Sequence, residues 1–365
     1  MELVEQPDVH LAVAFGMSHA LARDAEPLLE KAARRADTEE DAAGAALARA
    51  LAAQMRLWTG EGLAHEAEQL GLAAVPLLEA REDHVGLAEV WYALANGVYN
   101  YGFRQEQIAQ AAEMARSYET LAGRPHQRSD ALLAMALIEG QRPVGEVMRR
   151  IDAFDSVFPI DLMRATVLAM SDRMEEARAL ARTAEQHARE TGRSAHMFIA
   201  EIESLSGDHE AAAEQVSLWC DVLADRGWAS GVTYYLGLLG RELCLAGRYE
   251  EAEQRAVQAR ERYEDAPGLQ ALWRQAAALV STHQGDYAEA ERLAREALTY
   301  THETDSPRFQ ADAFCDLAEV LEAAGRREKA VAAWREALGC YERKGIIPLA
   351  RRTRERLATL EKPLM

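Results

Sequence analysis

The stretch GRYEEA at residues 247–252 returns further along the chain as GDYAEA at 285–290 and as GRREKA at 325–330. Each copy lies between two segments whose apolar residues recur at helical spacing. Glycine permits a tight turn at the start of each copy, and the mostly small residues four and seven positions after its last Ala let two helices approach closely. Three copies at intervals of 38 and 40 residues therefore predict a protein built from helical hairpins.

Weaker copies of the same turn extend the series toward the N-terminus. The turn position falls at Gly207, at Asp172 in place of Gly, and at Gly140, Gly102 and Gly60. Successive turn positions are separated by 32 to 42 residues, around the roughly 34-residue period of tetratricopeptide (TPR) repeats. The sequence therefore indicates TPR-like repeats along most of the chain.

The two ends complete the predicted array. The first sixty residues are expected to hold one more hairpin, with a turn near Asp24 and a second helix from about Pro27. After a break at Gly345, a final helix from Pro348 to about Lys362 is expected to cap the open end of the array.

The fold class follows from these repeats and from a composition rich in helix-forming residues. We predict an all-α fold, a right-handed α-solenoid of about nine TPR-like hairpins with a C-terminal capping helix. Because each repeat packs on its neighbours, we expect residues 1–365 to form one domain. Its parts would be an N-terminal hairpin region at 1–60, repeats at 61–345 and the cap at 346–362.

Charge and composition exclude several classes of function. The formal net charge is −19, so the surface repels phosphate backbones and direct nucleic-acid binding is not expected. The chain shows neither a signal-peptide pattern nor an apolar run of membrane-spanning length, so we expect a cytoplasmic protein with no membrane partner. Four cysteines without CxxC spacing and ten dispersed histidines favour no metal site, and no cofactor is expected.

Five segments depart from generic repeat composition. They are GLAEVW at 86–91, GQRPV at 140–144, ALWR at 271–274, DAFCDLAEVL at 312–321 and ALGCYERKG at 337–345. In this order they resemble the C-terminal TPR-like region of large bacterial signalling proteins, which join a class III adenylate or guanylate cyclase domain to a P-loop regulatory ATPase. Related arrays end some ATPase-type transcriptional regulators.

The resemblance covers residues from about 22 to about 360 and implies a sensor or interaction array. The sequence has no GxxxxGK[ST] phosphate loop, and helical repeats occupy the length that a cyclase domain would need. The resemblance therefore transfers no catalytic residue to this chain.

One candidate binding face lies on the predicted helix that ends at Gly102. Trp91, Leu94 and Val98 occupy its packing positions, and the opposite face would line the concave groove of the array. That face carries Glu89, Tyr92, Asn96, Tyr99 and Asn100. Asn and Tyr are only moderate helix formers but suit binding, because they combine adaptable hydrogen bonds with rigid contact area. Ordinary packing between repeats is the alternative.

A second candidate face lies on the helix before Gly247 and continues on later helices. Its residues are Trp228, Thr233, Tyr234, Tyr235 and Arg241, followed by Gln275, Thr282, His283, Asp312, Asp316, Glu319 and Glu322. Mixed polarity of this kind suits a peptide or protein partner. Aromatic residues at helical spacing also form cores, and a charged face can simply be solvated, so both alternatives stay open.

Other groups favour structural or solvent roles. The many acidic pairs have no evident reason to be buried, which acid–base catalysis would require. Cys315 has no basic neighbour in the sequence and reads as a small buried thiol. The segment 343–362 carries seven basic residues against two acidic ones, and is either a solvated cap or a dock for an acidic partner or a second protomer, so a homodimer is possible.

The sequence therefore predicts a non-catalytic array that binds a protein or peptide partner, or senses a ligand, in bacterial signal transduction or transcriptional regulation. A ligand that prefers one curvature of the solenoid would shift its shape. One alternative is the sensor fragment of a cyclase–ATPase regulator, with an apolar first helix (Leu11, Val13, Phe15, Met17) at the former junction. The other is an enzyme hidden inside a helical toroid.

Overall fold

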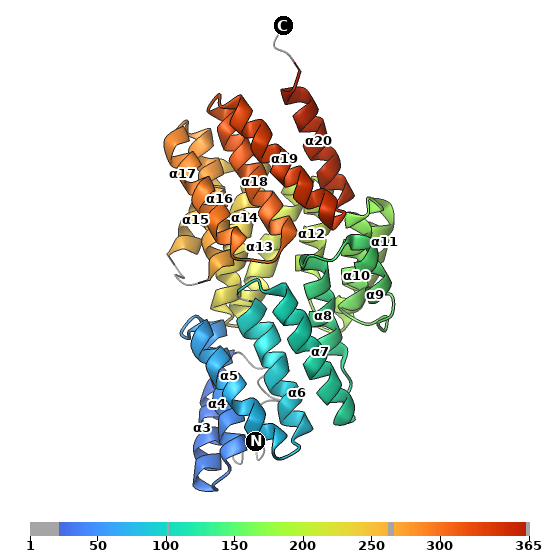
Figure 1. Ribbon diagram of the computed structural model, residues 1–365, viewed down its shortest axis with the longest axis vertical. Helices are drawn as coiled ribbons and strands as arrows, with labels where there is room; N and C mark the ends of the chain where they lie inside the picture. The colour runs from blue at the N-terminus through green and yellow to red at the C-terminus, as the bar shows by residue number, and fades with distance from the viewer. Residues whose placement is uncertain (1–21, 101, 262–265, 363–365) are drawn as a thin grey trace. The chain divides into compact units, whose positions relative to one another are not determined.

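The computed structural model describes residues 22–100, 102–261 and 266–362, and in these residues it contains helices and no strand (Figure 1). The predicted all-α fold is confirmed. The apolar residues Leu11 to Met17, proposed as a former junction, lie outside the described residues.

The helices follow one another in chain order with short connections. They are α3 (Ala22–Thr38), α4 (Ala42–Thr59), α5 (Ala64–Glu79), α6 (His84–Ala93), the π-helix η1 (Leu94–Tyr99), α7 (Gln105–Leu121), α8 (Gln127–Glu139), α9 (Val144–Ile151), α10 (Ile160–Met170), α11 (Met174–Glu190), α12 (His196–Ser206), α13 (His209–Asp225), α14 (Ala229–Leu245), α15 (Tyr249–Arg260), α16 (Pro267–His283), α17 (Tyr287–His302), α18 (Pro307–Ala323), α19 (Arg327–Lys344) and α20 (Ile347–Leu360).

The predicted turn residues separate the two helices of each hairpin. Gly247 has φ +81°, a left-handed conformation that costs glycine little. Asp172, which replaces glycine in its repeat, adopts the same conformation with φ 63°. At the Gly102 turn the positive φ falls one residue later, on Phe103, with φ 53°. The periodicity read from the sequence therefore matches the hairpins from α4 to α19.

The predicted turn near Asp24 is wrong. Helix α3 includes Asp24 in its first turn and continues through Pro27 to Thr38. An acidic side chain is favourable in the first turn of a helix, because it faces the free N–H groups and the positive end of the helix dipole. Asp24 therefore marks the start of a helix instead of a break before one.

The chain packs as two compact units. Unit 1 is Met1–Leu133 with Asp221–Val232, and unit 2 is Ala134–Cys220 with Thr233–Met365. A single domain over the whole chain stays a prediction.

Unit 1 has an apolar core between α3, α4, α5 and α6. Leu51, Leu78 and Val90 are buried in it, and the rings of Trp58 and Trp228 pack 5.0 Å apart at its margin. Within unit 1 the segment after α6 is the π-helix η1. Gly97 of η1 lies so close to α4 that an added Cβ would come within 3.0 Å of the Gln54 side chain.

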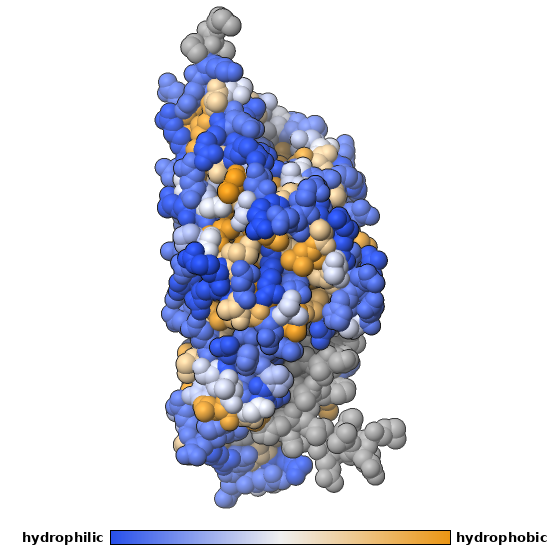
Figure 2. All heavy atoms as spheres, turned by 90° about the vertical axis from the view of Figure 1, so that its right-hand side faces the viewer, coloured by the Kyte–Doolittle hydropathy of each residue, from blue (hydrophilic) through white to orange (hydrophobic). Residues whose placement is uncertain are grey.

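Small residues allow close packing of the hairpins in unit 2. Ala252, Ala256 and Ala259 of α15 are all buried, as the repeat pattern predicts. Figure 2 shows the side of the molecule that carries α11 and α20, where hydrophilic side chains cover most of the surface and hydrophobic ones form smaller patches. Across the described residues, no helix is long and apolar enough to traverse a membrane.

The C-terminal helices of unit 2, α19 and α20, pack against helices near its N-terminal end (Figure 1). Lys344, at the end of α19, is buried and donates hydrogen bonds to the carbonyl oxygens of Leu137 (2.9 Å), Gly140 (2.5 Å) and Arg142 (2.8 Å). Helix α20 contacts α10 and α12. Helix α20 thus packs on α19 as the predicted cap and also reaches α10 and α12, which closes unit 2 on itself.

The basic side chains of α20 have partners inside unit 2. Arg351 pairs with Asp172, and Arg356 pairs with Glu322. Arg352 donates to the carbonyl of Ser204 at 3.3 Å. The excess positive charge of this segment is therefore largely balanced by contacts within the unit.

The turn conformation gives a direct test of the repeat geometry. Gly247→Ala should lower the free energy of unfolding by about 1 kcal/mol, because a Cβ is unfavourable at φ +81°. Gly145→Ala is the matched control, since its Cβ on α9 would meet nothing within 4 Å, and it should raise stability by ~0.5 kcal/mol. Urea unfolding followed by circular dichroism measures both. Equal effects of the two substitutions would contradict the assigned turn.

Candidate functional site

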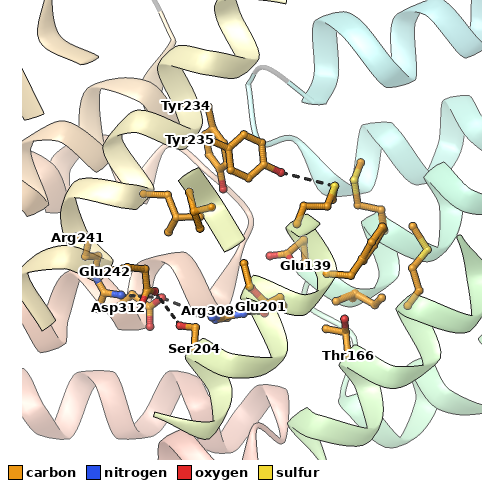
Figure 3. Close-up of a pocket in the computed structure, with 18 residues that line it drawn as sticks. Glu139, Thr166, Glu201, Ser204, Tyr234, Tyr235, Arg241, Glu242, Arg308 and Asp312 are labelled. Atoms are coloured by element: carbon orange, nitrogen blue, oxygen red, sulfur yellow. Dashed lines mark hydrogen bonds and ion pairs between the residues drawn. The ribbon is translucent and has the colours of Figure 1, made fainter. Parts of the chain in front are cut away.

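A cavity of about 110 Å³ lies inside unit 2 (Figure 3). Its walls come from α8, α10, α12, α14 and α18, with Val216 of α13 as a further contact. The five helices are each the first helix of a hairpin. The cavity therefore lies on the face that first helices share, which is the concave face expected of a TPR-like array.

One repeat position supplies the cavity from several hairpins. The residue six positions before the turn residue is Thr166 in α10, Glu201 in α12 and Arg241 in α14, and all three line the cavity. The same scaffold position thus presents a hydroxyl, a carboxylate and a guanidinium group to one space. This position therefore contributes three of the polar groups of the site.

The apolar side of the cavity is rich in sulfur and aromatic groups. Met135, Met163 and Met197 line it together with Phe198 and Leu238. Methionine side chains are unbranched and polarizable, so they adapt to the shape of a bound group.

Two tyrosines stand at one end of this apolar wall. The rings of Tyr234 and Tyr235 meet edge to face with centroids 4.7 Å apart, and the Tyr235 hydroxyl donates to the sulfur of Met197 at 3.8 Å. Burial raises the pKa of both phenols, so both stay neutral at physiological pH.

The polar end is organised by a buried ion pair. Arg241 donates from Nε to Oδ2 of Asp316 at 2.8 Å and from Nη2 to Oδ1 at 2.9 Å. Arg241 is 8% exposed and Asp316 is 1% exposed. Burial raises the pKa of the Asp316 carboxyl, and the Arg241 guanidinium opposes that rise. The bidentate geometry fixes the orientation of Arg241.

Asp312 links this pair to a second arginine. Its Oδ2 lies 3.8 Å from Nη1 of Arg241 and 3.7 Å from Nε of Arg308. Its Oδ1 accepts a hydrogen bond from the Tyr341 hydroxyl. Arg308 also pairs with Glu201. Both arginines of the cavity therefore have carboxylate partners.

The other two carboxylates of the cavity differ in their surroundings. Glu242 accepts a hydrogen bond from Ser204 at 2.8 Å, and Nδ1 of His209 lies 2.7 Å from its other oxygen. Glu139, the last residue of α8, has no hydrogen bond or ion pair with any described residue. Figure 3 shows its carboxylate facing the space between the tyrosines and the Arg308–Glu201 pair.

Four of the residues predicted for the second face line the cavity, namely Tyr234, Tyr235, Arg241 and Asp312. Asp316 is buried and holds Arg241 by its two hydrogen bonds, and the buried Gln275 lies beside Asp316.

Glu319 is half-buried on α18, and burial together with the nearby Asp316 raises the pKa of its carboxyl to about 7.

The remaining residues of that prediction lie elsewhere. His283 is exposed and stacks on the ring of Tyr249, with centroids 3.8 Å apart. Thr233 is buried, and Glu322 pairs with Arg356. Trp228 belongs to unit 1, where it packs on Trp58.

Residues of the first predicted face, in unit 1, make ion pairs and ring contacts with neighbouring arginines of that unit. Glu89 is 1% exposed and accepts hydrogen bonds from Arg124 at 2.9 Å and from both terminal nitrogens of Arg128 at 2.7 and 2.8 Å. The guanidinium of Arg128 also lies over the ring of Tyr92, 4.4 Å from its centroid. Glu89 is thus part of a buried ion cluster.

The π-helix changes the register of this face. Asn96 and Tyr99 lie in η1, and Asn100 follows it. Because a π-helix has i→i+5 hydrogen bonds, the α-helical spacing behind the prediction does not decide which of these residues share a face with Tyr92. Tyr99 is buried, with Arg104 over its ring, while Asn96 and Asn100 are half-buried. Their binding role stays a prediction.

Sequence reasoning missed several residues of the cavity, above all Glu139, Glu201, Glu242 and Arg308. The turn position could have found two of them. Glu201 stands six residues before Gly207, as Arg241 does before Gly247, and Glu139 directly precedes Gly140. The three methionines carry no sequence signal that separates a cavity wall from a core.

The thiol of Cys315 lies close to the same polar groups. Its sulfur is 3.5 Å from the Tyr341 hydroxyl, and burial raises the pKa of the thiol. A raised pKa disfavours the thiolate that a nucleophile needs. Cys315 packs, partly buried, against the apolar core of the last helices of unit 2.

Solved structures of helical-repeat proteins are similar to this chain. One is the crystal structure of the APC/C hetero-tetramer Cut9–Hcn1, with 13% identity over 97% of this chain and 77% of the other, and a TM-score of 0.53. Another is a Rap protein complexed with competence and sporulation factor, with 12% identity over 97% and 99% of the two chains and a TM-score of 0.59. No protein-family model and no curated protein matches the sequence. The fold is thus a TPR-like α-solenoid.

The buried ion pair can be tested by a double-mutant cycle. Arg241→Met and Asp316→Leu should each cost about 3–5 kcal/mol, because each leaves the other charge buried without its partner. The double variant should cost much less than the sum of the two. The exposed pair Arg354–Glu342 (2.8 Å) is the control, for which each change should cost less than ~1 kcal/mol. Additive losses at Arg241 and Asp316 would refute the coupling.

Glu319 should give the unfolding midpoint a defined pH dependence. Its pKa of about 7 in the folded protein exceeds the ordinary value of 4.5, so the folded state holds the proton more tightly than the unfolded chain does. The resulting stabilisation is present below about pH 4.5 and is lost as the pH rises through 7. Glu319→Gln should flatten the wild-type decline over this window, whereas the exposed control Glu355→Gln should leave it unchanged.

Proposed function

We propose that this chain is a non-catalytic TPR-like array that binds a protein or peptide partner, with the cavity of unit 2 in the binding surface. The observation that carries the proposal is the convergence of five first helices on one cavity with an apolar wall and a polar end. Pockets of this composition are typical of ligand sites, where apolar contact supplies affinity and a few fixed polar groups supply orientation.

The size of the cavity suggests how a peptide would bind. About 110 Å³ is below the roughly 150 Å³ of an engineered cavity that holds benzene. It is therefore suited to one side chain, while the peptide backbone would run across the opening. One buried anchor residue surrounded by weaker contacts is a common way for interfaces to gain specificity.

Similar structures support binding of this kind. The Cut9 chain forms a hetero-tetramer with Hcn1, and the Rap protein is complexed with competence and sporulation factor. For this chain, the resemblance of its segments to the TPR-like regions of cyclase–ATPase proteins further favours a cytoplasmic role in bacterial signal transduction or transcriptional regulation. A sensor fragment of such a regulator would use the same surface.

The polar end offers a means of coupling binding to shape. Arg241, Asp312 and Arg308 join α14 to α18, and Glu201 brings in α12. A partner that contacts these residues would favour one arrangement of the three helices over others. A ligand shifts a conformational equilibrium only by its difference in affinity for the two states.

Peptide selection tests this function. Random twelve-residue peptides displayed on phage are selected on the full chain, and the affinity of the selected peptides is measured by fluorescence polarisation. The double variant Met197→Ala/Tyr235→Ala removes two side chains of the cavity wall and should lower the affinity of the selected peptides at least tenfold. Met114→Ala/Tyr287→Ala is the control, since it removes the same two residue types from exposed positions, at 37% and 40% exposure.

Two outcomes would end the proposal. One is a failure to select any peptide, and the other is equal binding by wild type and the cavity variant. Circular dichroism and the thermal midpoint of each variant separate a lost contact from a lost fold.

A further inference from the structure

We infer that the cavity of unit 2 receives a cationic side chain, that of a lysine or arginine residue of the partner, with its charged end at Glu139. The inference rests on the proposed function and adds the chemistry of the anchor residue.

The charge of the cavity is negative. Four carboxylates line it, those of Glu139, Glu201, Glu242 and Asp312, against two guanidinium groups. Both guanidinium groups have carboxylate partners, so the cavity offers no free cation to an acidic side chain. An entering acidic group would meet unbalanced negative charge in a partly desolvated space, where such repulsion costs most.

Glu139 is the group left for a ligand. Among the described residues it alone of the four carboxylates has neither a hydrogen bond nor an ion pair. It lies at the C-terminal end of α8, where the helix dipole adds partial negative charge. A cation in the cavity would gain a charge-assisted hydrogen bond, which is about twice as strong as a neutral one.

A lysine close enough to act on Glu139 has its hydrogen bonds elsewhere. The ammonium group of Lys344 acts on Glu139 through space, but its three hydrogen bonds go to the carbonyls of Leu137, Gly140 and Arg142. An ammonium group has three donors, so Lys344 has none left for the carboxylate.

The apolar wall fits the rest of such a side chain. Lysine and arginine have long aliphatic stems below their charged ends, and these stems are commonly buried along apolar surface. Met135, Met163 and Met197 would contact the stem. Tyr235 would add an aromatic face for the cation. A purely aliphatic side chain would fill the same wall but leave Glu139 without a partner.

Methyl-labelled methionine provides the readout. The full chain is prepared with [ε-13C]methionine, and the signals of Met135, Met163 and Met197 are assigned by single Met→Leu variants. The probes are the N-acetyl methylamides of arginine, lysine, norleucine and glutamate. Titration of the three signals should give the arginine or lysine probe an affinity at least tenfold higher than that of the norleucine probe. The glutamate probe should shift none of the three signals.

Glu139→Gln is the decisive variant, because it keeps the shape and removes the charge. It should lower the affinity for the cationic probes about tenfold and leave the affinity for the norleucine probe unchanged. Glu336→Gln, exposed on α19, is the matched control and should behave as wild type. Equal affinities for norleucine and arginine, or no effect of Glu139→Gln in a folded variant, would overturn the inference.

The selected peptides separate this failure from failure of the proposed function. Peptides that need the cavity wall but tolerate norleucine at every lysine and arginine would keep peptide binding and refute the cationic anchor. Peptides that lose affinity only when one lysine or arginine is replaced would support both.

Discussion

Lys344 donates three hydrogen bonds from a buried ammonium group to carbonyl oxygens at the end of α8 and just beyond it. Burial lowers the pKa of this lysine to about 8, a sign of how unfavourable the site is for a charge without compensation. The compensation comes from carbonyls that the end of a helix leaves without backbone donors. This contact holds α19 against α8, and α8 contributes Met135 and Glu139 to the cavity. The closure of unit 2 and its cavity therefore depend on the same interaction.

The cavity also shows how a repeat scaffold acquires chemistry. Hairpin geometry sets the direction of the residue six positions before the turn, and the identity of that residue differs from one repeat to the next. Thr166, Glu201 and Arg241 occupy that position in three successive hairpins. The ion pairs of Arg241 and Arg308 with acidic residues of α18 and α12 then order the polar end. Methionines leave the opposite wall adaptable.

Local patterns predicted the fold well, because turns and helix contacts follow from a few neighbouring residues. Gly247 marks its hairpin turn, and even Asp172 takes the left-handed conformation that its place in the series requires. The residues of the cavity were harder to predict from the sequence. Arg241 and Asp312 were found by counting from turns, but the pairing of Arg241 with Asp316, and that of Arg308 with Glu201, depends on how helices cross. The π-helix at 94–99 broke the spacing used for Asn96 and Tyr99. The return of α20 to α10 and α12 is a long-range contact that no local pattern encodes.

The proposed partner peptide would enter unit 2 through the concave face formed by the first helix of each hairpin. Photo-crosslinking from position 238 tests it most directly. A benzoylphenylalanine in place of Leu238, which lines the cavity, should crosslink to a selected peptide next to its lysine or arginine. The same probe in place of the exposed Tyr287 on α17 should give no crosslink. Crosslinking from position 287 and not from 238 would contradict the account.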